Sequence, residues 1–341
     1  MKAVRLHEYG QPPAVEDVPE PVVTRPHDVI VRIGGAGLCR TDLHIIEGQW
    51  QAKSGVTLPY TLGHENAGWV QAVGSAVDQV REGDPVIVHP LVTCGYCRAC
   101  RAGDDMHCTA STFPGIDTDG GFAELLKTGV RSVVKLDPGI RPEDVAALAD
   151  AGLTAYHAAK KAAAILPPGS YALVLGAGGL GHIGVQSLKA LTAATVIVVD
   201  PSEAALQLAR ASGADHAVAS DGQQVAAVLE LTGGLGCEAV LDFVGEGGAI
   251  GDALAMLRRA GSYYAIGYGG TLSIRAIDII ASEINVVGNL VGTYNDLVEL
   301  MTLTSQGRVT LRTRSYPLAA AGTAIDDLAH GRLAGRGILI P

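Results

Sequence analysis

Short runs of β-branched and apolar residues, separated by turn-forming residues, dominate the chain up to about residue 150. Residues 29–33, 68–74 and 84–88 are three such runs, and each predicts a strand. Prolines at positions 12, 13, 19, 21 and 26 argue against helices near the start, because proline fixes φ and lacks an N–H group. The pattern predicts a partly closed, antiparallel β domain over residues 1–150.

From about residue 151 the apolar runs alternate with stretches of helical periodicity. Strands are expected at 171–175, 195–199, 217–219, 239–243, 262–266 and 284–287, and helices at 180–191, 203–212, 222–232 and 248–259. Six strands with intervening helices predict an α/β domain with a doubly wound sheet over residues 151–290. A helix at 295–306 and a tail at 335–340 are expected to rejoin the first domain, so that residues 291–341 complete it.

Composition and charge narrow the possible functions. The chain has 341 residues, of which 48% are hydrophobic and 18% charged, as is typical of a globular protein of two domains. A net charge of −10 argues against a nucleic-acid partner, since phosphates require a basic surface. The first eleven residues lack the apolar core of a signal peptide, and no apolar run reaches membrane-spanning length. We therefore expect a cytoplasmic protein that acts on a small molecule.

Four cysteines fall within fifteen residues, spaced by two, two and seven: Cys94, Cys97, Cys100 and Cys108. This spacing allows four thiolates to converge on one tetrahedral Zn²⁺, and such a closed shell leaves no position for a substrate. The sequence therefore predicts a structural zinc site in a lobe at 94–108 that has no core of its own. The alternatives are disulfides or free thiols.

A glycine-rich stretch follows the predicted strand at 171–175 and opens the predicted helix at 180–191. An acidic residue, Asp200, comes 19 residues after the last glycine of this stretch, Gly181. In this context the glycines predict a site for the pyrophosphate of a dinucleotide, at the N-terminus of the helix. Asp200 would accept hydrogen bonds from the adenosine ribose and repel a 2′-phosphate, which favours NAD over NADP. The alternative is a glycine-rich turn without a ligand. The stretch comprises Gly176, Gly178, Gly179, Leu180 and Gly181.

A second metal site is indicated by residues that lie outside the cysteine cluster. His64 alone is more often a core or loop residue than a ligand, but Cys39 precedes it and Asp150 lies near the predicted join to the dinucleotide domain. A catalytic zinc needs three ligands of these types and an open fourth position. The sixth cysteine, Cys237, has no such partner and is expected to be a buried thiol.

Taken together, these motifs resemble those of the zinc-dependent medium-chain alcohol dehydrogenases, over essentially the whole chain. The resemblance implies a GroES-like catalytic domain, a Rossmann NAD-binding domain, and two zinc ions per subunit, one catalytic and one structural. Asp150 stands where a Cys₂His zinc shell would have its second cysteine, which resembles many bacterial secondary-alcohol dehydrogenases and carbonyl reductases. The motifs are 39-CRTDLH-44, 63-GHENAG-68, 94-CGYCRACRAGDDMHC-108, 150-DAGLT-154 and 176-GAGGLG-181.

The resemblance also implies catalytic roles. Zinc would polarise the substrate oxygen. Thr41 corresponds to the hydroxyl that hydrogen-bonds this oxygen, and His44 to the residue that passes the proton through the nicotinamide ribose to solvent. Asp42 would orient His64. Glu65 would lie behind the zinc and ligate it transiently, and the alternative is a purely structural role.

The expected cofactor site includes two arginines, Arg40 and Arg336, at positions that hold the pyrophosphate in the family; the alternative for Arg336 is a solvated tail residue. Ala205 stands where relatives often carry Lys or Arg near the ribose, which adds no positive charge in favour of NADP. The other residues expected at the cofactor are the glycine stretch, Thr154, Asp200, Val244, Gly267 and Val291.

The substrate is expected to be a mainly hydrophobic alcohol, ketone or aldehyde, because the segments that line the family's cleft carry apolar or aromatic residues. Core packing is the alternative explanation for each of them. A polyol or amino-alcohol dehydrogenase and a non-catalytic zinc- and nucleotide-binding sensor are the alternative functions. Relatives pair the last strand of the dinucleotide sheet, which implies a homo-oligomer, either a dimer or a tetramer. The cleft residues are Trp50, Phe113, Ile116, Leu290 and Tyr294.

Overall fold

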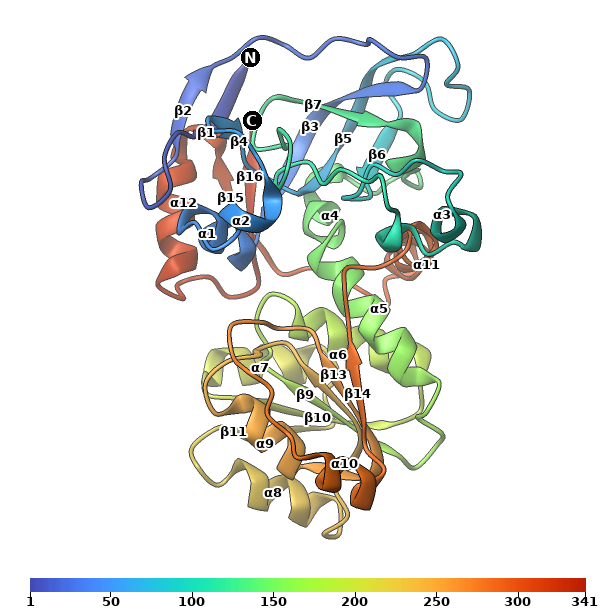
Figure 1. The fold of residues 1–341 in the computed structure, drawn as a ribbon, viewed down its shortest axis with the longest axis vertical. Helices are drawn as coiled ribbons and strands as arrows, with labels where there is room; N and C mark the ends of the chain where they lie inside the picture. Colours follow the sequence, from blue (N-terminus) through green and yellow to red (C-terminus); the bar gives the residue numbers. More distant parts are fainter. The chain divides into compact units, whose positions relative to one another are not determined.

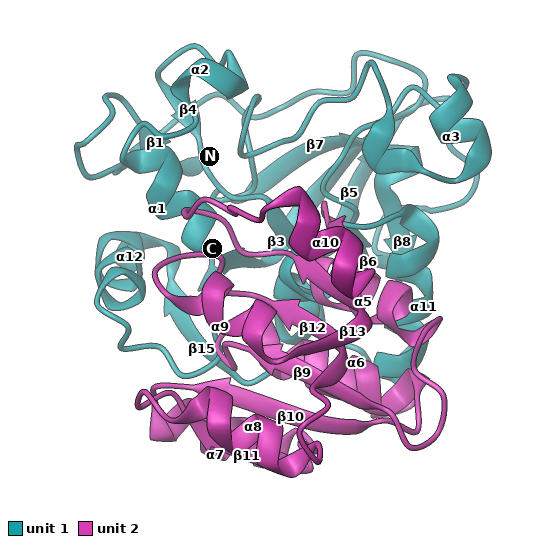
Figure 2. Cartoon of the chain, turned by 60° about the horizontal axis from the view of Figure 1, so that its bottom comes forward, with its two compact units in different colours: residues 1–153, 292–305, 311–341 teal, residues 154–291, 306–310 magenta.

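The computed structural model describes residues 1–341 and divides the chain into two compact units, drawn in teal and magenta in Figure 2. Unit 1 comprises residues 1–153, 292–305 and 311–341, and unit 2 comprises residues 154–291 and 306–310. The chain therefore passes from unit 2 back to unit 1 between Val291 and Gly292. No helix is both long and apolar enough to cross a membrane.

Unit 1 is built around one long, almost wholly buried strand, β3 (Asp28–Leu38). It pairs antiparallel with β5 (Glu65–Val73), β7 (Leu125–Gly129) and β16 (Arg336–Ile340). This arrangement is the antiparallel β domain that was predicted, and β16, from the C-terminal tail, is one of its strands (Figure 1). The same sheet includes β6 (Pro85–Val88), β8 (Val133–Lys135) and β15 (Thr313–Pro317), and a smaller sheet holds β1 (Lys2–Leu6), β2 (Ala14–Asp17) and β4 (Tyr60–Thr61).

Glycines in β3 allow its neighbours to approach closely. A Cβ atom added at Gly37 would lie 2.1 Å from the Glu65 Oε2 atom and 3.0 Å from the Ala147 Cα atom. The missing side chain thus leaves room for Glu65 behind the strand. The helices that involve unit 1 are α1 (Arg40–Ile46), α2 (Gln51–Ser54), α3 (Arg98–Ala102), α4 (Pro142–Val145), α5 (Ala151–Ala163), α11 (Tyr294–Ser305) and α12 (Ala321–Ala329).

Unit 2 contains the predicted six-stranded parallel sheet. Its spatial order is β11-β10-β9-β12-β13-β14, which is the 3-2-1-4-5-6 order of the dinucleotide-binding fold. Ligands bind such sheets outside the carboxyl ends of the strands, where the order reverses between β9 and β12. The strands are β9 (Tyr171–Leu175), β10 (Thr195–Asp200), β11 (His216–Ala219), β12 (Cys237–Asp242), β13 (Leu257–Ala265) and β14 (Asn285–Gly288).

Two helix predictions in unit 2 need correction. The helix expected at 248–259 is α9 (Ala249–Ala255), because Leu257 already pairs with Cys237 at the start of β13. Residues 276–282 form α10 (Ala276–Ser282), which was not predicted. The other helices, α6 (Gly181–Leu191), α7 (Glu203–Ala211) and α8 (Gln224–Leu231), lie where the periodicity predicted them.

Candidate metal and cofactor sites

Four residues of unit 1 converge although they are far apart in the sequence: Cys39, His64, Glu65 and Asp150. Each offers one ligand atom, and these atoms all lie within 4.8 Å of one another. Cys39 lies between β3 and α1, His64 directly precedes β5, and Asp150 directly precedes α5. The site is therefore assembled from the ends of separate elements rather than from one motif.

Asp42 connects two of these residues. It is fully buried, its Oδ2 accepts the Cys39 N–H group at 2.8 Å, and its Oδ1 lies 3.3 Å from the His64 Nδ1. The other ring nitrogen, Nε2, lies 3.5 Å from the Asp150 Oδ2. Asp42 thus orients the histidine so that Nε2 points toward the other ligand candidates.

The donors in this cluster fit a metal cation. Although the two His64 nitrogens lie within ion-pair distance of Asp42 and Asp150, neither they nor the buried Asp150 Oδ1 has a hydrogen-bond partner. Burial raises the pKa of Asp150 and of Glu65, since a carboxylate without water is stabilised only by nearby positive charge. One sulfur, one imidazole and one carboxylate form a ligand set that zinc accepts in an open, catalytic site.

Glu65 has partners for both carboxylate oxygens. Oε1 accepts the Ala151 N–H group at 3.0 Å, and Oε2 pairs with the guanidinium of Arg336 in β16. Arg336 is only 4% exposed, so it is not a solvated tail residue. Burial lowers its pKa, but the Glu65 carboxylate outweighs this effect and the net shift is upward. Arg336 was predicted at the cofactor, and no pattern in the sequence indicates this pairing with Glu65.

The first turns of α1 carry the residues predicted to move a proton. Thr41 and His44 are both half-buried and lie three positions apart, on neighbouring positions of one helix face. Arg40, at the start of the same helix, is exposed.

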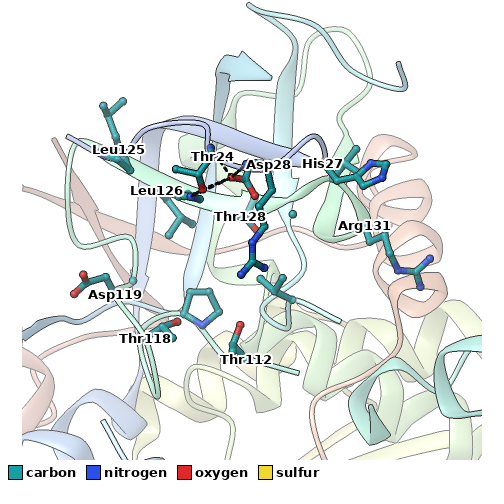
Figure 3. A pocket seen from close by; sticks show the side chains of 18 of the residues that line it. Thr24, His27, Asp28, Thr112, Thr118, Asp119, Leu125, Leu126, Thr128 and Arg131 are labelled. Atoms are coloured by element: carbon teal, nitrogen blue, oxygen red, sulfur yellow. Dashed lines mark hydrogen bonds and ion pairs between the residues drawn. The ribbon is translucent and has the colours of Figure 1, made fainter. Parts of the chain in front are cut away.

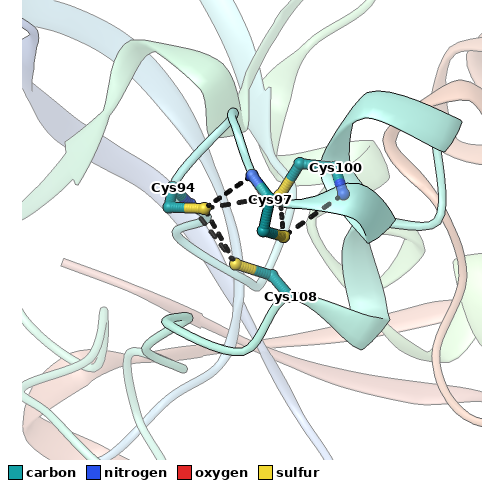
Figure 4. Close-up of side chains that lie close together, drawn as sticks. All are labelled: Cys94, Cys97, Cys100 and Cys108. Atoms are coloured by element: carbon teal, nitrogen blue, oxygen red, sulfur yellow. Dashed lines mark hydrogen bonds between the residues drawn. The ribbon is translucent and has the colours of Figure 1, made fainter.

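The cysteine cluster forms a second compact group, in which the four sulfurs point toward one another (Figure 4). The distances from Cys97 to Cys100, Cys108 to Cys94 and Cys94 to Cys100 are 3.5, 3.6 and 4.0 Å between sulfurs. Four sulfurs bound at about 2.3 Å around a tetrahedral ion would lie about 3.8 Å apart, whereas a disulfide needs about 2 Å. The backbone N–H of Cys100 lowers the pKa of the Cys97 thiol to about 6, which favours the thiolate that zinc requires.

In unit 2 the glycine stretch forms the turn between β9 and α6. Gly176 has a φ of +83°, and a Cβ atom at Gly181 would lie 1.8 Å from the Gly176 carbonyl oxygen. Only glycine fits both positions. Asp200, at the carboxyl end of β10, accepts the N–H groups of Ala177 and Ser202, both at 2.8 Å. It therefore holds the glycine turn, and its oxygens retain further lone pairs for a ligand.

Two other predicted cofactor residues of unit 2 follow the neighbouring strands. Val244 comes after β12 and Gly267 after β13, and a Cβ atom at Gly267 would lie 2.4 Å from the Val244 carbonyl carbon. Thr154 lies in the first turn of α5 and Val291 follows β14. Val244 and Gly267 are thus brought together by backbone packing at the carboxyl edge of the sheet.

The residues predicted to line the substrate pocket lie in different environments. The ring of Phe113 meets that of His64 edge to face, with centroids 6.0 Å apart, and Trp50 packs against the core of unit 1. Ile116 is part of that core, which agrees with the packing alternative. The Tyr294 hydroxyl donates to the Val133 carbonyl at 3.2 Å, and Leu290 is 55% exposed in unit 2.

Unit 1 also contains a cavity of about 1320 Å³ away from the Cys39 cluster. Thr112, Asp119, Thr128 and Arg131 are among the residues that line it (Figure 3). None of the predicted ligands of the open metal site lines this cavity, although Cys94 of the Cys₄ cluster does. It is therefore separate from the open metal site.

Comparison with known proteins agrees with this architecture. Residues 25–138 match the family described as the alcohol dehydrogenase GroES-like domain, and residues 179–306 match the zinc-binding dehydrogenase family. The protein class is thus a zinc-binding dehydrogenase, with the GroES-like and Rossmann domains that were predicted.

Relatives that match over the full length of the chain narrow the protein class further than the two domain families do. An NAD-dependent alcohol dehydrogenase of Sulfurisphaera tokodaii is 35% identical, with 100% of each chain covered. The D-arabinose 1-dehydrogenase (NADP(+)) of Saccharolobus solfataricus is 34% identical, over 100% of this chain and 97% of that protein. The crystal structure of the alcohol dehydrogenase from Aeropyrum pernix is 48% identical, with a TM-score of 0.97 and 100% of each chain covered. The chain therefore belongs to the zinc-dependent medium-chain alcohol dehydrogenases.

Proposed function

We propose that this enzyme transfers a hydride reversibly between NAD(H) and a mainly hydrophobic alcohol, ketone or aldehyde. The observation that carries the proposal is the convergence of Cys39, His64 and Asp150, which would supply three ligands and leave one position open. A zinc ion held there would polarise the substrate oxygen. We expect about two zinc ions per chain, the second bound by the Cys₄ cluster.

The test is metal analysis combined with turnover of simple alcohols and ketones. Cys39→Ser and Asp150→Ala should each abolish turnover and remove one zinc per chain while leaving the other in place. An enzyme that stays fully active after complete removal of metal would refute the proposal. A protein that binds zinc and NADH without turning over any substrate would instead support the sensor alternative.

Thr41 and His44 are proposed to move the proton, with the Thr41 hydroxyl at the substrate oxygen. Both come from one face of α1, which begins directly after Cys39. Thr41→Ser should retain most of the activity and Thr41→Val should lose it, because only the hydroxyl is needed. His44→Gln should lower kcat and change its pH profile. Equal activity of the serine and valine variants would contradict the role of Thr41.

NAD is proposed as the preferred cofactor because Asp200 lies at the carboxyl end of β10, where its charge would repel a 2′-phosphate. The other residues proposed at the cofactor are Arg40, Thr154, Val244, Gly267, Val291 and Arg336 with the glycine stretch. Asp200→Ser should raise the KM for NAD and lower that for NADP. An unchanged ratio of the two would show that Asp200 does not set the preference.

The substrate class rests on the apolar character of Trp50 and Phe113, the latter against the ring of His64. The similarity to a D-arabinose dehydrogenase favours a polyol or sugar as the second candidate. Turnover of a panel of secondary alcohols, ketones, aldehydes, polyols and amino alcohols separates the two candidate substrate classes. The class with the higher kcat/KM values is the preferred one.

A homo-oligomer formed through unit 2 is also proposed. Strand β14 is an edge of the sheet, and α10 next to it exposes Ile277 and Ile280. An exposed strand edge with apolar neighbours can pair with its copy across a two-fold axis. Ile280→Asp should reduce the mass measured by sedimentation, whereas a monomeric wild-type protein would refute the proposal.

A further inference from the structure

The backbone at Val291 is unusual. Its φ is +46°, in the left-handed region that a β-branched residue rarely adopts, and the residue is buried. Such a conformation persists only where neighbouring contacts determine it. Val291 is the last residue before the chain returns to unit 1 at Gly292. The contacts of the residues before and after the Val291–Gly292 peptide bond therefore bear on the backbone conformation of Val291.

On the unit 2 side, Asn289 fixes the chain. Its N–H donates to the Ala265 carbonyl at 3.0 Å, and its side-chain amide donates to the Thr154 carbonyl at 3.3 Å. Both acceptors belong to unit 2. The segment that leads into Val291 is therefore anchored to the sheet and to α5.

On the unit 1 side, a buried histidine holds the next residue. The His89 Nε2 lies 3.0 Å from the Gly292 carbonyl, and its Nδ1 lies 3.3 Å from the Leu91 N–H group. A neutral ring with its hydrogen on Nε2 satisfies both contacts. His89 comes directly after β6 and is 2% exposed, so this hydrogen bond is shielded from water.

The second anchor comes from the Cys₄ lobe. Asp105 lies between Cys100 and Cys108, is buried, and accepts the Tyr294 N–H group at 3.2 Å through Oδ2. Its Oδ1 lies 3.5 Å from the guanidinium of Arg131. Tyr294 is the first residue of the twelve-residue helix α11, so the carboxylate lies at the positive end of the helix dipole. The Tyr294 hydroxyl fixes the same residue to β8.

We propose that the Cys₄ lobe and His89 fix the chain at Gly292–Tyr294, directly after Val291, and that Asp105 and His89 are thereby positioning residues for the cofactor. This inference rests on the proposed function, in which Val291 is one of the residues at the cofactor. The structural zinc would then do more than hold its own loop, because the loop it folds carries the acceptor for α11. Neither Asp105 nor His89 needs to touch the cofactor or the substrate.

The experiment compares Asp105→Ala with Asp104→Ala in the zinc-loaded, full-length enzyme. Asp104 is exposed and neighbours Asp105 in the same loop, which makes it a matched control. Hydrogen–deuterium exchange of residues 292–298 should accelerate about tenfold in Asp105→Ala and stay at the wild-type rate in Asp104→Ala. The KM for NAD should rise about three- to tenfold in Asp105→Ala, with a smaller change in kcat.

Because Asp105→Ala could release the structural zinc, a second pair of variants lies outside the lobe. His89→Gln keeps an N–H donor at the position of Nε2, whereas His89→Leu removes it. Exchange of residues 289–295 should accelerate in the leucine variant and recover in the glutamine variant, with zinc content unchanged in both.

Wild-type exchange in both Asp105→Ala and His89→Leu overturns the proposal, as does equal acceleration in Asp104→Ala. Faster exchange with an unchanged KM for NAD overturns the role in cofactor positioning. Exchange is measured without turnover, so failure of the proposed dehydrogenase activity is distinguishable: the exchange contrast would persist in a protein that oxidises no alcohol.

Discussion

The buried ion pair between Glu65 and Arg336 should contribute strongly to the free energy of unfolding, and removal of one partner alone should cost more than removal of both. Arg336→Met replaces the guanidinium by an apolar side chain of similar length and leaves the Glu65 carboxylate buried with one remaining partner, the Ala151 N–H group. Glu65 is fully buried, so water cannot replace the lost cation.

Removing one partner of a buried ion pair typically destabilises a protein by about 3–5 kcal/mol. An unfolding entropy of about 2.1 cal/mol/K per residue, applied to 341 residues, converts this into a fall in Tm of about 4–7 °C if the chain unfolds cooperatively. The double variant Glu65→Gln/Arg336→Met removes both charges. The double variant should lose less free energy of unfolding than Arg336→Met, by about 2 kcal/mol or more, because no uncompensated charge remains.

The assay is a double-mutant cycle by calorimetry or urea unfolding, on zinc-loaded protein at one pH, with wild type, both single variants and the double variant. Activity should fall in Arg336→Met as well, since Glu65 also holds the start of α5 next to Asp150. A loss below about 1 kcal/mol in Arg336→Met, or strictly additive single effects, would show that the pair behaves like an exposed one and would refute the reasoning.

Three further outcomes are expected. Burial alone would raise the pKa of Asp28, but the surrounding N–H groups and the Lys127 ammonium lower this pKa from 3.8 to about 2. The carboxylate therefore contributes to the free energy of unfolding above about pH 4, and this contribution is lost as the pH falls toward 2. Asp28→Asn should accordingly be less stable than wild type by about 2 kcal/mol at pH 7, with the gap closing between pH 4 and 2 in urea unfolding. Gly181→Ala should lower the Tm because its Cβ would meet the Gly176 carbonyl, whereas Gly178→Ala, with nothing within 4 Å, should leave the Tm of the cofactor-free protein unchanged. Cys108→Ser should reduce the bound zinc by one per chain and lower the Tm, as measured by metal analysis and calorimetry.

Local patterns account for what could be predicted from the sequence. The alternation of strands and helices, the glycine turn before α6 and the spacing of the four cysteines each lie within a few tens of residues, where period and spacing are informative. The convergence of Cys39, His64 and Asp150 was inferred from the residue types and the family resemblance, because no periodicity connects them.

The contacts that were missed join distant segments. Arg336 and Glu65 are 271 positions apart, and Tyr294 and Asp105 are 189 apart. Such pairs depend on which strands become neighbours, here β16 beside β3 and β3 beside β5, and no hydrophobic pattern specifies that choice. His89 has no signal of its own, since a histidine after a buried strand is common in any core.

The position of β16 beside β3 has a consequence for biosynthesis. A ribosome completes all of residues 154–291 before it makes Arg336, so the parallel sheet of unit 2 can form while β3 still lacks its neighbour. Until then Glu65 lacks the guanidinium that pairs with it, and the ligand cluster around it is without that counter-charge. The dinucleotide unit can therefore mature during translation, whereas the metal centre matures only when the chain is nearly finished.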